Sequence, residues 1–120
     1  MNNMDFFKGL NIAITVSDKD GNVIYQNDSS LEVNGDARGR NLEKCHNPKS
    51  WEMIRHMIDD NVSNVYTISK KGKKKLIYQT PWYEENGERK TENGEVKREP
   101  AGLVEFSIIL PEEMPHYDRG

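Results

Sequence analysis

The sequence contains one cysteine, Cys45, and no long run of apolar residues. A single cysteine excludes an intrachain disulfide and a cysteine-rich zinc site. No stretch approaches the roughly 18 apolar residues of a membrane-spanning helix. The first residues also lack the basic and apolar regions of a secretion signal. We therefore expect a cytoplasmic protein with no membrane partner.

An excess of charge of one sign is also missing. Lys and Arg number 17 against 20 Asp and Glu, for a formal net charge of −3 and a mean hydropathy of −0.90. This surface is hydrophilic and mildly acidic, without an overall bias towards nucleic acid. The 120 residues, of which 34% are hydrophobic, suit one domain with one core.

Signatures of catalysis are absent too. The sequence has no nucleophile elbow, phosphate loop or His-x-x-x-His zinc pair, and no acid–base constellation can be assembled. The Asp-Lys-Asp-Gly segment of residues 18–21 lacks the other ligands of a calcium loop, and turn chemistry explains its aspartates. We predict a protein that is not an enzyme and has no metal site.

An alternating apolar pattern predicts a β-hairpin over residues 11–27. Its aspartate- and glycine-containing turn separates two strands, each with one apolar face. Further strands are predicted at residues 65–69, 74–83 and 101–110. The charged segment 84–99, with two Asn-Gly pairs, reads as a solvent-facing loop or ribbon.

The longest predicted helix covers residues 48–60. Asn47 is a candidate N-cap, and Pro48 suits the first helical position. Trp51, Ile54 and Ile58 recur at spacings of three and four, which is typical of a helix packed on a sheet. Shorter helical segments are expected at residues 4–10 and within residues 28–39. Helices in the middle of the chain favour an antiparallel sheet covered on one face.

With this order of elements, the sequence resembles the PAS domain family. The matching segments are AITVSDKDGNVIYQN, GRNLEKCHNPKS and AGLVEFSIIL, and together they cover roughly residues 10–111. The Cys-His-Asn-Pro segment is similar to that of a bacterial PAS subset. The resemblance implies an α+β fold, with a five-stranded antiparallel sheet and helices packed on one face. The charged insertion at residues 84–99 departs from the family pattern.

The resemblance also implies signal transduction by ligand binding or dimer rearrangement. We expect a sensory or protein-interaction module over residues 10–111, an N-terminal helix or arm over residues 1–9, and a flexible tail over residues 112–120. A small ligand between helix and sheet and a signalling protein as partner are both compatible with this hypothesis.

Apolar and aromatic side chains are candidates for lining a ligand cavity, although each also suits an ordinary core. These candidates are Trp51, Ile54, Ile58, Tyr66, Tyr78, Trp82 and Phe106.

Haem is the candidate cofactor of the alternative hypothesis, a redox or gas sensor. Cys45 and His46 precede the longest helix and are candidate axial ligands. His56 is a third candidate, because haem-binding members of the family use a histidine on this helix. Its position, about 200° around the helix from Ile54, favours an exposed side chain instead. The alternative for Cys45 is a small buried residue, and for His46 a hydrogen bond to a loop carbonyl.

Homodimerisation is predicted from apolar residues that a lone monomer would expose. In the last strand, we expect Val104, Phe106 and Ile108 to face the core, with Glu105 on the opposite face. The candidate dimer contacts are Phe6, Phe7, Leu10, Leu103 and Ile109.

Overall fold

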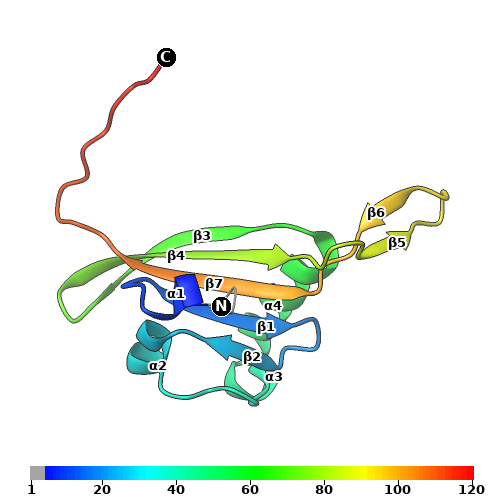
Figure 1. Ribbon diagram of the computed structural model, residues 1–120, viewed down its shortest axis with the longest axis horizontal. Helices are drawn as coiled ribbons and strands as arrows, with labels where there is room; N and C mark the ends of the chain where they lie inside the picture. The colour runs from blue at the N-terminus through cyan, green and yellow to red at the C-terminus, as the bar shows by residue number, and fades with distance from the viewer. Residues whose placement is uncertain (1–4) are drawn as a thin grey trace.

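The computed structural model describes residues 5–120, without the side chains of Asp5 and Cys45. Its centre is a five-stranded sheet in the order β2-β1-β7-β4-β3, in which every neighbouring pair is antiparallel (Figure 1). The predicted five-stranded antiparallel sheet is confirmed. The strands are β1 (Ala13–Asp18), β2 (Val23–Gln26), β3 (Asn64–Lys70), β4 (Lys73–Trp82) and β7 (Gly102–Ile109).

Three of the four helices lie between β2 and β3 in the chain. The helices are α1 (Asp5–Lys8), α2 (Asp28–Asn34), α3 (Leu42–Cys45) and α4 (Pro48–Asp60). Asn27, Asn41 and Asn47 each cap the next helix by accepting a hydrogen bond from a backbone N–H of its first turn. The predicted helix 48–60 and its N-cap are confirmed. No helix in residues 5–120 is both long and apolar enough to cross a membrane.

A two-stranded ribbon, β5 (Glu88–Lys90) and β6 (Val96–Arg98), projects beyond one end of the main sheet (Figure 1). It lies within the charged segment predicted as a loop or ribbon. Arg89 donates a hydrogen bond of 3.3 Å to the Asp59 carbonyl at the end of α4. The chain after β7 runs away from the sheet without helix or strand.

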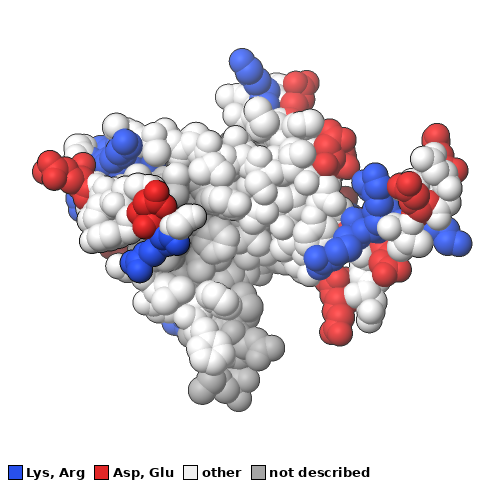
Figure 2. Space-filling view, turned by 90° about the horizontal axis from the view of Figure 1, so that it is seen from above, with Lys and Arg blue, Asp and Glu red and all other residues white. Residues whose placement is uncertain are grey.

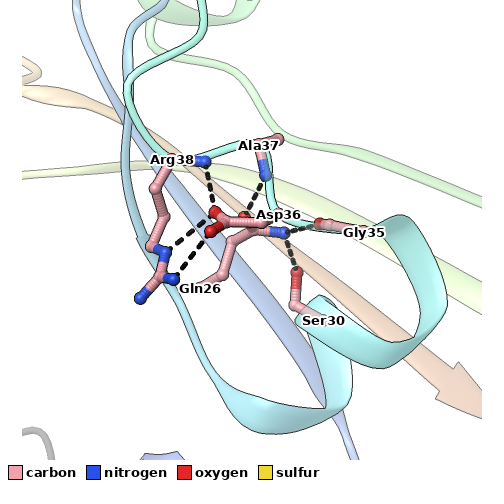
Figure 3. A network of polar contacts seen from close by, with 6 residues as sticks. All are labelled: Gln26, Ser30, Gly35, Asp36, Ala37 and Arg38. Carbon is pink, nitrogen blue, oxygen red and sulfur yellow. Dashed lines mark hydrogen bonds and ion pairs between the residues drawn. The ribbon is translucent and has the colours of Figure 1, made fainter.

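Polar contacts hold α2 and the loop after it against the edge strand β2 (Figure 3). The buried Gln26 amide donates to Ser30 Oγ at 2.9 Å and to the Gly35 carbonyl at 3.0 Å. Its Oε1 accepts from the Ala37 N–H at 2.7 Å. These bonds satisfy the carboxamide and fix the start of the loop that leads to α3.

The helix-facing side of β7 is the opposite of the one predicted. Leu103 is only 4% exposed and packs with Ile54, Met57 and Ile58 of α4. Because strand side chains alternate, Glu105 shares this inner face, and Phe106 lies on the outer face. The prediction of Leu103 as an exposed dimer contact is therefore wrong. The reason is that β7 carries apolar residues on both faces, so alternation alone does not identify the buried one.

The other predicted dimer contacts are exposed. Phe6, Phe7 and Leu10 have 68%, 43% and 39% of their surface accessible, and Ile109, at the end of β7, has 52%. The predicted arm of residues 1–9 includes α1, whereas its residues 1–4 lie outside the described part. The division into arm, domain and tail stays a prediction.

Candidate functional site

Three cavities lie on the inner face of the sheet, and Glu105 of β7 lines each of them. The largest, of about 310 Å³, lies between the sheet and the stretch from His46 through α4. A second, of about 150 Å³, reaches towards the end of α2, and a third, of about 30 Å³, lies below Leu42 of α3. We call these three spaces together the Glu105 cavity.

A row of polar side chains crosses the inner face of the sheet. The strand register aligns Asn64 of β3, Gln79 of β4, Glu105 of β7 and Thr15 of β1. Asn64 Nδ2 donates to Gln79 Oε1 at 3.2 Å, and Gln79 Nε2 donates to Glu105 Oε1 at 3.4 Å. Thr15 Oγ1 lies 2.6 Å from Ser30 Oγ of α2. We refer to these four residues as the polar row.

Glu105 is desolvated without a cationic partner. Burial raises the pKa of its carboxyl, which the Gln79 hydrogen bond and the nearby His46 ring lower in part. None of the ion pairs among residues 5–120 involves Glu105. Burial, together with the Glu105 charge, also raises the pKa of Tyr66 on β3. The sheet thus holds a carboxyl group where its ionised form is poorly stabilised.

Two further polar groups face the Glu105 cavity. Ser17 is 2% exposed, and its Oγ has no hydrogen-bond partner within the described part of the chain. His46 Nδ1 lies 3.0 Å from the Leu42 carbonyl. Because a carbonyl only accepts, Nδ1 must carry the proton, and a neutral ring keeps Nε2 as an acceptor. Both residues line the 30 Å³ space with Glu105.

The predicted cavity residues divide into two groups. Ile54 and Tyr66 line the Glu105 cavity. Ile58 lies in the core, and Trp51 packs against that core and over Gly21. Tyr78, Trp82 and Phe106 are not in the cavity, because the register of β4 and β7 puts them on the outer face.

Sequence reasoning missed the polar row. The prediction placed Glu105 on the solvent side of β7 because it expected the helices on the other face. A usable signal exists, since Glu105 is the one charged residue between Ala101 and Leu110. Gln79 and Asn64 gave no comparable signal, because polar residues are common on half-exposed strands.

The two histidines among the haem candidates differ in position. His46 is exposed and borders the cavity, whereas the exposed His56 lines none of the three spaces and pairs with Asp60 one helical turn on, as helical periodicity predicted. The Cys45 thiol lies outside the described part, so its role stays a prediction. The cavity does not fit haem well, because the polar row occupies the surface against which an apolar porphyrin face would pack. The side chains that the structure describes, which exclude the Cys45 thiol, form no cluster of three or more metal-ligating groups.

The pH dependence of the protein's stability should reveal whether the Glu105 carboxyl is desolvated. Replacing Glu105 by glutamine, which keeps the acceptor for Gln79, should raise the midpoint of thermal unfolding at pH 7 and leave it unchanged at about pH 3. A carboxyl whose pKa is raised by folding favours the folded state below its unfolded pKa of about 4.3, and this contribution is lost as pH rises through the folded pKa. Calorimetry across this range is the measurement.

The exposed Glu52 of α4 supplies the control for this experiment. Its replacement by glutamine should shift stability by no more than about 0.5 kcal/mol at either pH. A Glu105→Gln protein that is less stable than the unmodified chain at pH 7 would contradict the assignment of Glu105 as a desolvated carboxyl.

Among protein-family models and curated proteins, none matches this chain. Solved structures do match. A PAS domain from Colwellia psychrerythraea superposes with a TM-score of 0.58 at 18% identity, covering 89% of this chain and 92% of that one. The Aer2 receptor of Vibrio cholerae, described as a dual PAS-haem oxygen sensor, gives 0.54 at 13% identity, covering 83% and 95%.

VqmA of Vibrio cholerae, bound to DPO, gives a TM-score of 0.59 at 18% identity. The match covers 91% of this chain and 56% of the VqmA chain. At these identities the likeness concerns the fold. This likeness of fold agrees with the strand order, the antiparallel pairing and the helices between β2 and β3. The chain therefore has the fold of PAS domains.

Proposed function

We propose that this chain is a sensory module of signal transduction that binds a small polar molecule in the Glu105 cavity. The observation that supports this most is that a desolvated carboxyl without an ion pair and the unpartnered Ser17 hydroxyl line the same space. Buried polar groups without partners cost stability, and proteins retain them mainly at functional sites. VqmA, a protein of similar fold, is described as bound to a small molecule.

The proposed signal is a shift of α4 relative to the sheet. Both α4 and the sheet contribute walls to the cavity, so a ligand that contacts both favours one arrangement of the two. Arg55 of α4 donates to the Lys19 carbonyl in the β1–β2 turn at 2.6 Å. Arg89 of the β5–β6 ribbon donates to the Asp59 carbonyl at the C-terminal end of α4. These contacts couple a displacement of α4 to two exposed segments that a signalling partner can reach.

Self-association is the second part of the proposal. Figure 1 draws α1 in front of the sheet and α4 behind it, so α1 and the outer face are on the same side. The side chains of Phe6, Phe7, Val65 and Tyr78 are each between 39% and 68% exposed there. Figure 2, which views the molecule from above relative to Figure 1, shows few charged side chains along the middle of the molecule and clusters of them towards its ends. Exposed apolar area of this kind is typical of a homodimer contact.

A haem sensor remains the second candidate function. The Nε2 atom of His46 is free to act as a ligand, and the Aer2 receptor of similar fold is described as a haem sensor. The polar row argues against it, because it replaces the apolar surface that a porphyrin requires. We therefore expect a colourless protein from cells supplied with haem precursors. A Soret band would instead make the haem sensor the better-supported function.

The test is a screen of small polar metabolites against isotope-labelled protein by nuclear magnetic resonance. A ligand of the Glu105 cavity should shift the side-chain amide signals of Asn64 and Gln79, because both groups line it. The signals of the β5–β6 tip, residues 91–95, serve as the control. Shifts confined to exposed residues would refute the cavity, and a constant monomer mass in sedimentation would refute the dimer.

A further inference from the structure

The hydrogen bonds of the polar row run in one direction. An ionised carboxylate only accepts, so Gln79 must turn Nε2 towards Glu105 and Oε1 towards Asn64, which donates. The row therefore ends on the carboxylate. One bond of 3.4 Å, to Oε1, is the sole hydrogen bond that Glu105 side-chain oxygens accept within residues 5–120. Glu105 thus has a single long hydrogen bond although its carboxyl is largely desolvated.

The groups beside Glu105 add to this excess of acceptors. The Nδ1 of His46 donates to the Leu42 carbonyl, so in the neutral form of the ring Nε2 is an acceptor. The hydroxyl of Ser17 has no partner and can accept as well as donate. Both line the same space as Glu105. Among the described side chains, Gln79 is thus the one donor to Glu105, and no cation forms an ion pair with it.

The lysines of the cavity do not supply that charge. Lys49 lines the largest space, and Lys70 and Lys75 line the one nearer α2. None of them forms an ion pair or hydrogen bond with Glu105. A bound anion would meet the Glu105 carboxylate without a compensating cation beside it. A divalent metal is also disfavoured, because the described side chains provide no cluster of three ligating groups.

We infer that the Glu105 cavity takes a small organic cation, a primary amine whose ammonium N–H groups donate to Glu105, with Ser17 and His46 as neighbouring acceptors. The ammonium group gives the desolvated Glu105 carboxylate the cationic partner that it lacks, and it gives the Ser17 hydroxyl a hydrogen-bond partner. A space of about 310 Å³ limits the ligand to a small molecule. This inference rests on the proposed function, since it names the chemical class of its ligand.

The experiment compares three four-carbon probes, butylamine, butyrate and butanol, by titration of labelled protein. Butylamine should shift the side-chain amide signals of Asn64 and Gln79, and its affinity should fall about tenfold or more in Glu105→Gln. The matched control, Glu52→Gln on the exposed side of α4, should bind it as the unmodified chain does. Glu105→Gln is expected to be more stable at neutral pH, so lost binding would not reflect unfolding.

The outcomes separate this inference from the proposed function. If butyrate or butanol moves the inner-face signals and butylamine does not, the ligand class is wrong and the cavity still binds a small molecule. If butylamine binds equally to Glu105→Gln, the assigned contact is wrong. If butylamine leaves the inner-face signals unchanged, the inference is overturned, and the broader metabolite screen alone then decides the proposed function.

Discussion

Replacing Asn27 by aspartate should lower the free energy of unfolding by about 3 kcal/mol or more, or prevent folding. Asn27 is 0% exposed and uses its whole carboxamide. Its Oδ1 accepts from the backbone N–H of Ile14 at 2.9 Å and of Ser30 at 3.0 Å. Its Nδ2 donates to the carbonyls of Phe7 at 2.9 Å and Ile12 at 2.8 Å. One side chain thereby joins α1, the segment that precedes β1, strand β1 and the start of α2.

Aspartate has nearly the same shape and keeps both acceptors, but it supplies no donor to the two carbonyls. The Ile12 carbonyl loses its donor, which costs about 1–3 kcal/mol, and the Phe7 carbonyl keeps only the 3.4 Å bond from the Leu10 N–H. The buried negative charge adds to this cost. Because protonation restores one donor, the loss should be smaller at about pH 4 than at neutral pH. Urea denaturation followed by circular dichroism measures the difference.

Asn47 provides the matched control for this substitution. It caps α4 from an exposed position, and its Oδ1 accepts from the Ser50 N–H at 2.8 Å. Aspartate preserves this bond and is favourable at a helix N-terminus, so Asn47→Asp should change stability by less than about 1 kcal/mol. Equal stability of the two aspartate variants would refute the role assigned to the Asn27 network.

The sequence allowed the order of strands and helices to be predicted because local chemistry dictates those elements. Asn47 and Pro48 identify the start of α4, and the aspartates and glycine after β1 identify its turn. The spacing of Trp51, Ile54 and Ile58 identified the helix but not the strand residues that it covers. Those contacts depend on the register of β7, which local patterns do not specify.

The candidate site escaped prediction for the same reason. The prediction assigned the wrong face of β7 to the core. It therefore placed Leu103 on the surface and Glu105 in solvent, whereas Leu103 lies in the core and Glu105 lines a cavity. Helical periodicity, in contrast, placed His56 correctly on the exposed side of α4. An amphipathic helix has one polar and one apolar side, so the spacing of its residues indicates which of them are exposed. A strand that is apolar on both faces offers no such distinction, and the lone carboxyl of Glu105 is the exception in β7.

Replacing Gly102 by alanine should cost about 3 kcal/mol or more, because a methyl group there has no space. Gly102 begins β7 and lies between Asp18 of β1 and Trp82 of β4. The indole ring of Trp82 lies against the glycine, and its Nε1–H donates to the Ser17 carbonyl at 2.8 Å. An added Cβ would lie 2.6 Å from that nitrogen and would collide with the Ser17 carbonyl oxygen.

Two further variants separate the possible causes of such a loss. Gly9→Ala introduces the same methyl group where no atom lies within 4 Å, and should stay within about 0.5 kcal/mol of the unmodified chain. Trp82→Phe removes the indole N–H and should cost about 1 kcal/mol. Adding Trp82→Phe to Gly102→Ala should not rescue stability, because the Ser17 carbonyl belongs to the paired strand and cannot move aside. Thermal unfolding measures the double variant. If its stability equals that of the unmodified chain, only the indole excludes a side chain at residue 102, and the β1–β7 pairing tolerates one.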